Sequence, residues 1–271
     1  MNLYRSRIAS YLIWRLVLCN PGFRRRLQSV LIRDRTETRT LIGAPVCMNA
    51  RSEIGYWRAA TQQTANVLFR DEVPQMLTVA SLLGEGSVFV DCGANVGLWS
   101  ANMARLRGVH RGLRILAFEA NPDTFARLQR TLAGVAGASA HNVALSDRTR
   151  TLEMAEGAVS GVFGVEGGDF KIAGTARAVA ARPLDEFLTG ERDIVMKIDV
   201  EGHELEVLQG AGEALARGRV RAVYIDGYDK AKGAAIAAML EGHGFRLLNG
   251  RTLAPFAAGD YAILAIKTGG A

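Results

Sequence analysis

Two groups of residues able to do chemistry stand out in this chain of 271 residues. The first is the turn 91–97, which reads Asp-Cys-Gly-Ala-Asn-Val-Gly and lies between an apolar run and a segment of helical periodicity. The second starts at Lys197 and reads Lys-Ile-Asp-Val-Glu-Gly-His-Glu, in the same setting. Both follow predicted buried strands, so their polar groups are expected at the carboxyl edge of one sheet, where α/β proteins bind ligands.

The glycine spacing of the first turn narrows the choice of ligand. Glycine lets a backbone approach a ligand closely because it has no Cβ. A dinucleotide fingerprint would need further glycines at 95 and 98, where Asn95 and Leu98 stand. A cofactor with a nucleoside and a cation but no phosphate fits better, and S-adenosylmethionine has this structure. We expect it to be bound by four residues of the turn, Asp91, Gly93, Asn95 and Gly97, with Asp91 facing its positive part.

Two residues farther along the chain extend the predicted cofactor site. Glu119 ends the next apolar run, where a carboxylate can accept hydrogen bonds from the ribose hydroxyls of an adenosine. The alternative is an acid stabilised by a helix dipole, because Asn121 and Pro122 begin a predicted helix. Asn142 lies near the end of the third predicted strand, at the expected position of the adenine ring.

The second group supplies the candidate catalytic residues. Asp199, Glu201 and His203 alternate after a predicted strand, so their side chains are expected to converge on one mouth. A helix N-terminus disfavours the charged imidazolium, which makes His203 a candidate general base for a hydroxyl proton. Asp199 is the rival base and could equally orient the cofactor, while dipole compensation alone would account for the glutamates. Two carboxylates without a third clear ligand make a weak Mg²⁺ site, and we expect no metal.

The rest of the chain alternates strand-like and helix-like segments. Strands are predicted at 87–90, 112–118, 138–143, 193–198, 219–225 and 261–266, and helices at 98–106, 122–132, 204–216 and 231–240. This pattern predicts an α/β, Rossmann-like fold in residues 76–271, with a mostly parallel central sheet and helices on both faces. Residues 1–75 form a predicted N-terminal helical extension. Together with the glycine-rich segment 154–180, expected to be a hairpin or a functional loop, it would house the acceptor and cover the pocket.

Composition indicates a cytoplasmic protein with an ordinary globular core. The chain is 49% hydrophobic and 22% charged, with a net charge of +6 that comes partly from arginines in the first 40 residues. We interpret these as a solvated basic face. The three cysteines, at 19, 47 and 92, lack metal-type spacing and are expected to be reduced. We find no transmembrane span or signal peptide in the sequence, and a homo-oligomer is compatible with it.

Several strings in order along the chain resemble the FkbM family of S-adenosylmethionine-dependent methyltransferases. They begin at Phe89 (Phe-Val-Asp-Cys-Gly-Ala-Asn-Val-Gly), Ala117 (Ala-Phe-Glu-Ala-Asn-Pro), Asn142 (Asn-Val-Ala-Leu-Ser-Asp), Arg182 (Arg-Pro-Leu-Asp-Glu-Phe) and Lys197. The similarity covers about residues 70–266. It implies a class I methyltransferase fold and transfer of a methyl group to a hydroxyl of a sugar or secondary metabolite.

The resemblance leaves the acceptor open. Similar proteins more often show a glutamate near Asp226, and the substrate pockets of the family vary. The main alternative is an RNA or DNA methyltransferase, motivated by the basic N-terminus, but no aromatic-rich basic stripe for base stacking is visible. A further alternative is a non-catalytic Rossmann-like scaffold. We therefore expect a small-molecule acceptor and no nucleic acid.

Overall fold

The computed structural model describes residues 33–62, 72–155 and 176–268. The strands are β1 (Thr36–Leu41), β2 (Ala44–Asn49), β3 (Val88–Cys92), β4 (Arg114–Phe118), β5 (Ala138–His141), β6 (Ala144–Leu145), β7 (Arg150–Ala155), β8 (Ala176–Arg182), β9 (Ile194–Ile198), β10 (Val220–Asp226), β11 (Phe245–Asn249) and β12 (Ala262–Lys267). The α-helices are α3 (Ile54–Gln62), α5 (Val73–Ala80), α6 (Leu98–Ala104), α7 (Pro122–Thr131), α8 (Glu204–Gln209), α9 (Gly212–Ala216) and α10 (Gly233–Gly242). Short 3₁₀ turns are η3 (Arg105–Gly108), η4 (Leu184–Phe187) and η5 (Lys230–Lys232).

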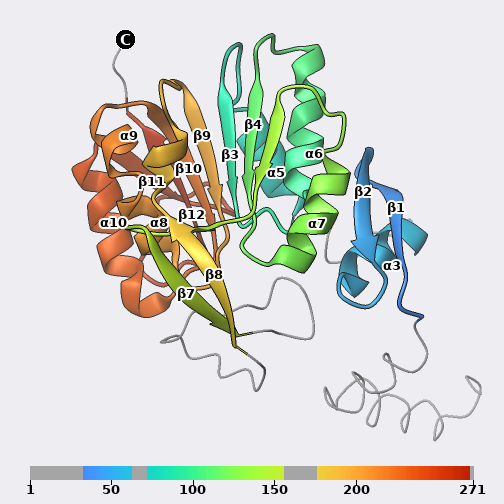
Figure 1. Cartoon of the computed structure of the whole chain (residues 1–271). Helices are drawn as coiled ribbons and strands as arrows, with labels where there is room; N and C mark the ends of the chain where they lie inside the picture. Colours follow the sequence, from blue (N-terminus) through green and yellow to red (C-terminus); the bar gives the residue numbers. More distant parts are fainter. Residues whose placement is uncertain (1–32, 63–71, 156–175, 269–271) are drawn as a thin grey trace, which may run out of the picture.

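A seven-stranded sheet with the order β11-β12-β10-β9-β3-β4-β5 forms the centre of the protein (Figure 1). Strands β10, β9, β3, β4 and β5 pair in parallel, whereas β12 is antiparallel to both of its neighbours. The strand order reverses between β3 and β9, and such a switch point opens a crevice at the carboxyl ends of the strands. The predicted mostly parallel sheet is confirmed.

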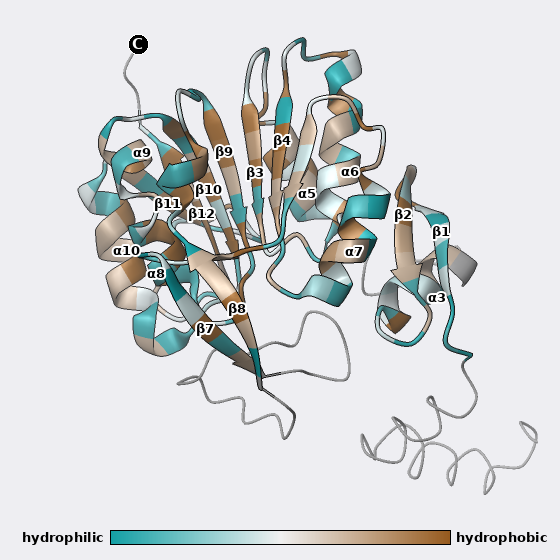
Figure 2. Ribbon diagram, in the orientation of Figure 1, coloured by the Kyte–Doolittle hydropathy of each residue, from teal (hydrophilic) through white to brown (hydrophobic). Residues whose placement is uncertain are grey.

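Helices cover both faces of this sheet. Alternate residues of β3 point to opposite layers: Val88 and Val90 are buried against the layer of α8, α9 and α10, and Phe89 against the layer of α5 and α6. The central strands are therefore apolar on both sides, as Figure 2 shows by their brown colour. This explains why they read in the sequence as continuous apolar runs.

The six predicted strands of the sheet are present, with ends shifted by a few residues. Strand β11 was not predicted. It lies at the edge of the sheet, and its apolar run is interrupted by the exposed Arg246. Edge strands carry a weaker pattern because they are not buried on all sides.

The predicted helix 204–216 is wrong as one element, because the chain breaks into α8 and α9. A Cβ at Gly210 would overlap the backbone carbonyl of Ser146, so the chain at Gly210 passes close to the end of β6. Asp185 then begins the second helix, since its carboxylate accepts hydrogen bonds from the N–H groups of Glu213 at 2.7 Å and Ala214 at 3.0 Å. The apolar periodicity of a segment cannot reveal a helix cap that a residue so distant in sequence supplies.

The predicted helical extension is wrong for residues 36–49, which form the antiparallel hairpin β1–β2. The turn at Ile42 and Gly43 has positive φ at both residues, as tight hairpins require. The hairpin is fixed to the main layer because the N–H of Cys47 donates to Thr131 Oγ1 of α7 at 2.9 Å, and Val46 and Met48 are fully buried. Helices α3 and α5 follow it. Residues 1–32 lie outside the described chain, and the domain boundary at residue 75 stays a prediction.

The ends of the glycine-rich segment form a hairpin. Strands β7 and β8 pair antiparallel from Arg150 opposite Ala181 to Ala155 opposite Ala176, and β6 adds to β8 in parallel. Residues 156–175 lie outside the described chain, so their predicted covering role is not addressed. Among the helices of the described residues, none is both long and apolar enough to cross a membrane.

Candidate active site

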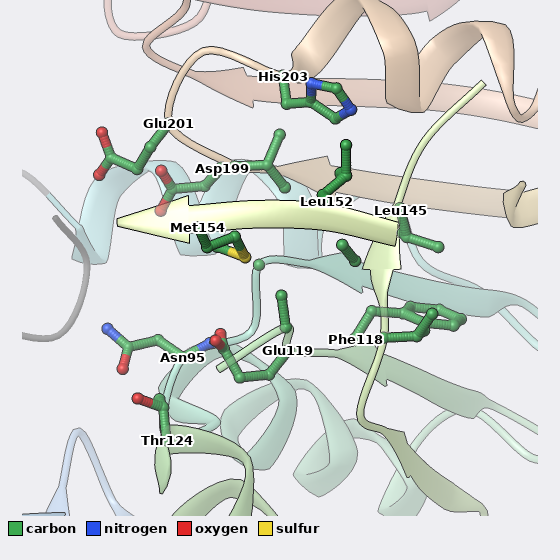
Figure 3. A pocket seen from close by; sticks show the side chains of 15 residues that line it. Asn95, Phe118, Glu119, Thr124, Leu145, Leu152, Met154, Asp199, Glu201 and His203 are labelled. Carbon is green, nitrogen blue, oxygen red and sulfur yellow. The ribbon is translucent and has the colours of Figure 1, made fainter. Parts of the chain in front are cut away.

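A cleft opens where β3, β4 and β9 end, with about 730 Å³ of empty space when the open solvent at its mouth is included (Figure 3). Its walls come from the glycine turn 91–97, which we call the cofactor turn, and from the end of β4, strands β6 and β7, and the turn after β9. The lining residues are Gly93, Asn95, Phe118, Glu119, Ala120, Thr124, Val143, Ala144, Leu145, Leu152, Met154, Asp199, Val200, Glu201 and His203. Of the residues predicted for the site, Gly93, Asn95, Glu119, Asp199 and His203 line the cleft together.

The two glycines of the cofactor turn are required for different reasons. Gly93 has φ of +76°, and a Cβ there would overlap the backbone carbonyl of Asp199. The turn is thus pressed against the chain that leaves β9, and this contact alone excludes a side chain. Gly97, with φ of +86°, caps α6, and a Cβ on it would lie 2.7 Å from Leu128 Cδ1 of α7. Gly97 therefore shapes the turn without lining the cleft, and its contact with the cofactor stays a prediction.

Asp91 does not line the cleft. Its carboxylate is fully buried, accepts a hydrogen bond from Ser100 Oγ at 2.7 Å and lies 3.3 Å from the ammonium of Lys197. The positive charge that Asp91 faces therefore belongs to the protein itself. Its predicted contact with the positive part of the cofactor stays a prediction.

Lys197 is a buried residue beside the cleft that was not predicted as part of the site. Its Nζ donates to the carbonyl of Gly93 at 2.9 Å and lies 3.4 Å from Asp199 Oδ2, so one buried ammonium connects the cofactor turn to the cleft wall. Burial by itself would lower the pKa of Lys197, yet the surrounding carboxylates, Asp199 and Asp91 foremost, raise it above its ordinary value. The lysine is therefore charged. The sequence signal was available: an isolated lysine inside an apolar strand that needs a buried partner.

Glu119 presents its carboxylate to the cleft from the end of β4. Oε2 accepts a hydrogen bond from the N–H of Asn95 and Oε1 accepts one from the N–H of Asn121, both at 2.9 Å. Burial raises the pKa of Glu119 to about 7, although the two backbone donors oppose the shift. Each carboxylate oxygen retains a further lone pair, so the group can still accept a hydrogen bond from a ligand hydroxyl.

Asn142 acts on the backbone beside the cleft. Its Nδ2 donates to the carbonyls of Glu119 at 2.9 Å and Ala120 at 3.1 Å, which fixes the chain after β4. Asn142 is not among the residues that line the cleft. Its predicted contact with the cofactor stays a prediction, while its contact with the backbone that carries Glu119 is established.

His203 lies at the N-cap of α8, buried in the cleft wall. Its Nε2 is 3.0 Å from Ser146 Oγ, and its Nδ1 is 3.5 Å from Glu206 Oε2, so both ring nitrogens face protein groups. Burial lowers the pKa of His203, and the positive charges of Lys232 and Arg150 lower it further against the opposing effect of Glu206. Burial and these charges therefore favour a neutral ring near pH 7, while the predicted effect of the helix terminus stays a prediction.

Asp199 and Glu201 stand on the open side of the cleft. The side chain of Asp199 is 37% exposed, and Lys197 is its ion-pair partner. Glu201 has φ of +53°, a conformation rare for a residue with a side chain. Partial withdrawal from water and the nearby charges of Asp199 and Glu204 raise the pKa of Glu201 to about 7. Within the described residues, no group of three His, Cys, Asp or Glu side chains is arranged to hold a metal ion.

The sheet order and the glycine turn, with a carboxylate at the end of the neighbouring strand, define the class of Rossmann-like methyltransferases that use S-adenosylmethionine. Residues 91–247, more than half of the chain, match the methyltransferase FkbM domain. The chain therefore belongs to the FkbM methyltransferase family. Methyltransferases of this family depend on S-adenosylmethionine. The cleft fits this cofactor, since the glycine turn lines it at Gly93 and Asn95 and the Glu119 carboxylate lines it beside them.

Comparison with individual proteins gives more distant matches. Hexuronic acid methyltransferase AglP of Haloferax volcanii is 32% identical over 136 residues, which cover 48% of this chain and 52% of that protein. The chain thus matches about half the length of this curated relative. The crystal structure of methyltransferase FkbM from Methylobacillus flagellatus KT shares 18% identity over 71% of this chain and 58% of that chain, with a TM-score of 0.44. A TehB-like methyltransferase from Corynebacterium glutamicum shares 13% identity over 79% and 94%, with a TM-score of 0.43.

Proposed function

We propose that the protein transfers the methyl group of S-adenosylmethionine to a hydroxyl of a sugar or secondary-metabolite acceptor. The observation that carries this proposal is the cleft itself, in which the predicted ribose ligand Glu119 and the candidate base Asp199 face the same space. The match to a hexuronic acid methyltransferase supports a sugar as the acceptor.

Residues of the cleft divide naturally between the parts of the cofactor. Glu119 would accept the ribose hydroxyls, and the apolar wall of Phe118, Val143 and Leu145 suits an adenine ring. The turn at Gly93 would hold the methionine part. When bound, the cofactor supplies an electrophilic methyl group on a positively charged sulfur.

The chain must then align the acceptor and remove its hydroxyl proton. We assign the proton to Asp199, because its side chain is partly exposed in the cleft and Lys197 holds it from one side at 3.4 Å. His203 is the rival base from the sequence. Its Nε2 would first have to leave Ser146, so we assign it the role of a neutral wall residue that the serine fixes.

Two measurements test the proposal. Calorimetry with S-adenosylmethionine reports cofactor binding, and transfer of a radiolabelled methyl group is then followed on a panel of glycosides, polyketides, carboxylic acids and total RNA. The proposal expects label in hydroxyl compounds. Label that enters RNA and none of the hydroxyl compounds would refute it in favour of the nucleic-acid alternative.

A cytoplasmic location is also part of the proposal. Cys47 and Cys92 are free thiols in the described chain, and both are buried. Free cysteines are usual where thiols are kept reduced.

A further inference from the structure

On the open side of the cleft, the neighbour of Asp199 across the two strands is Asp226 at the end of β10, which does not itself line the cleft. Ile225 is the parallel partner of Ile198, so the next residues along the two strands, Asp226 and Asp199, lie side by side at the carboxyl edge. If the nucleoside occupies the Glu119 side, as the proposed function requires, the acceptor has to approach the methyl group from this side.

An aromatic side chain, that of Tyr261, lies beyond Asp226, near the carboxylates of Asp199 and Glu201 and outside the residues that line the cleft. Tyr261 is 53% exposed, an unusual setting for so large a ring. The guanidinium of Arg251 lies 4.0 Å from the centre of this ring, and the same guanidinium is 4.0 Å from Asp226 Oδ1. We call these three residues, Asp226, Arg251 and Tyr261, the β10–β12 rim.

The β10–β12 rim is held in place by the chain around it. Tyr224 OH donates to Asp226 Oδ1 at 3.2 Å from within the sheet. The loop that precedes Tyr261 is held in place by two hydrogen bonds. Tyr228 OH donates to the carbonyl of Asp260 at 2.8 Å, and Lys230 Nζ donates to the carbonyl of Gly259 at 2.8 Å. A site whose side chains are fixed before binding loses little entropy when a ligand arrives.

The chemistry of the rim suits a polyhydroxylated ring. Carboxylates accept hydrogen bonds from hydroxyls, a guanidinium donates several in a fixed fork, and an exposed tyrosine ring can cover the C–H face of a pyranose. The Tyr261 side chain is 53% exposed, so part of its surface is open to such a contact.

The charge of this region distinguishes among sugars. Burial, and then repulsion by Asp199, raise the pKa of Asp226 above its ordinary value. The same carboxylate helps to raise the pKa of Glu201, so added negative charge is already unfavourable here. The two nearby cations are already paired with carboxylates of the protein: Arg251 with Asp226, and the buried Lys197 with Asp91. A second acid brought in by the acceptor would meet this repulsion, whereas neutral hydroxyls would relieve it.

We propose that the β10–β12 rim is the acceptor subsite and that it selects an uncharged glycoside over the corresponding uronate. This rests on the proposed function and narrows it. The matching relative is named for an acidic sugar, so the inference also predicts a difference in specificity between the two proteins.

Matched acceptor pairs test the inference with the full-length protein and radiolabelled S-adenosylmethionine. The probes are p-nitrophenyl β-D-glucoside against the glucuronide, and p-nitrophenyl β-D-galactoside against the galacturonide. We expect kcat/KM for the neutral member to exceed that for the acid by about tenfold or more, as one unfavourable charge contact of about 1.4 kcal/mol produces.

Variants locate the selectivity. Tyr261→Ala should raise the acceptor KM about fivefold, the size of a lost aromatic contact, with the S-adenosylmethionine affinity unchanged by calorimetry. Asp226→Asn should reduce the preference for the neutral member because it frees Arg251 and removes one carboxylate. Val109→Ala is the control, since Val109 is a similarly exposed apolar residue (70%) beyond the far end of α6.

Each remaining outcome overturns a stated part. Equal or faster transfer to the uronates, or an unchanged preference in Asp226→Asn, refutes the subsite while the proposed function stands. No transfer to any member of the pairs by a protein that binds S-adenosylmethionine refutes the glycoside acceptor, and with it the subsite.

Discussion

Replacing Glu119 by glutamine tests the central assignment of the cofactor site. The carboxylate accepts one hydrogen bond from the N–H of Asn95 and one from the N–H of Asn121. A glutamine has a single acceptor oxygen, so its NH₂ group would have to face one of these two donors. The change therefore removes the charge and disturbs one backbone contact, while the size of the side chain stays the same.

The expected loss of affinity follows from the bonds that the ribose would make. A hydrogen bond to a charged group contributes about 1.5–3 kcal/mol, so Glu119→Gln should weaken S-adenosylmethionine binding by roughly 10- to 150-fold. The wild-type protein should also bind more tightly as the pH rises. With a pKa of about 7, the ionised fraction of Glu119 grows about tenfold between pH ~6 and ~8, and the affinity should follow it.

Stability of the cofactor-free protein should change in the opposite direction. The folded-state pKa of Glu119 is raised from 4.5 to about 7, so the folded protein binds the proton more tightly than the unfolded chain does. The free energy of unfolding should therefore fall as the pH rises through this window, by about 3 kcal/mol from this group. Glu119→Gln should lack this fall.

Isothermal titration across the pH range measures the affinity, and urea unfolding measures the stability. The amine of the ligand also titrates near pH ~8, so the variant serves as the reference for the wild type. Glu213→Gln, an exposed acid paired with Arg217, is the matched control and should change neither quantity. A Glu119→Gln protein with wild-type affinity and the same pH dependence would show that Glu119 does not hold the ribose.

Three further predictions follow from the contacts around the cleft. Gly93→Ala should lower the thermal unfolding temperature well below that of Gly202→Ala. Both glycines have positive φ, but only at Gly93 would the new Cβ overlap a backbone carbonyl, that of Asp199. Equal shifts in the two variants would contradict this close contact. Lys197→Met should lower the free energy of unfolding, measured with urea, by about 3–5 kcal/mol because Asp91 is left buried without its cation. Adding Asp91→Asn should restore part of this free energy, and no recovery would argue against the ion pair. His203→Ala should keep the cofactor affinity measured by calorimetry and reduce kcat only modestly. A loss in kcat of about 10²–10⁴-fold would make His203 the base instead, provided that the pH–rate profile also loses the limb of a group titrating below the usual histidine range.

The sequence by itself determined the class of fold and the position of the cleft. Periodicity is a local property, and the central strands are buried on both faces, so their apolar runs were readable one at a time. The glycine turn and the acid at the end of the next strand lie at the carboxyl edge for the same topological reason. Glu119 and Asp199 could therefore be placed in one cleft without knowledge of any contact between them.

The tertiary structure decided what these residues touch. Gly93 is needed because the chain after β9 passes close to it, and Asp91 faces Lys197 instead of the cleft. His203 has Ser146 as its partner across 57 positions of the chain. Each contact joins segments far apart in sequence.

The same reason explains the two errors in secondary structure. Helix α8 ends where Gly210 meets the carbonyl of Ser146, and a distant carboxylate, that of Asp185, starts α9. The hairpin β1–β2 is stable because it packs on α7. Local patterns record the preference of a segment for helix or strand, but packing against a distant partner contributes more free energy and decides between them.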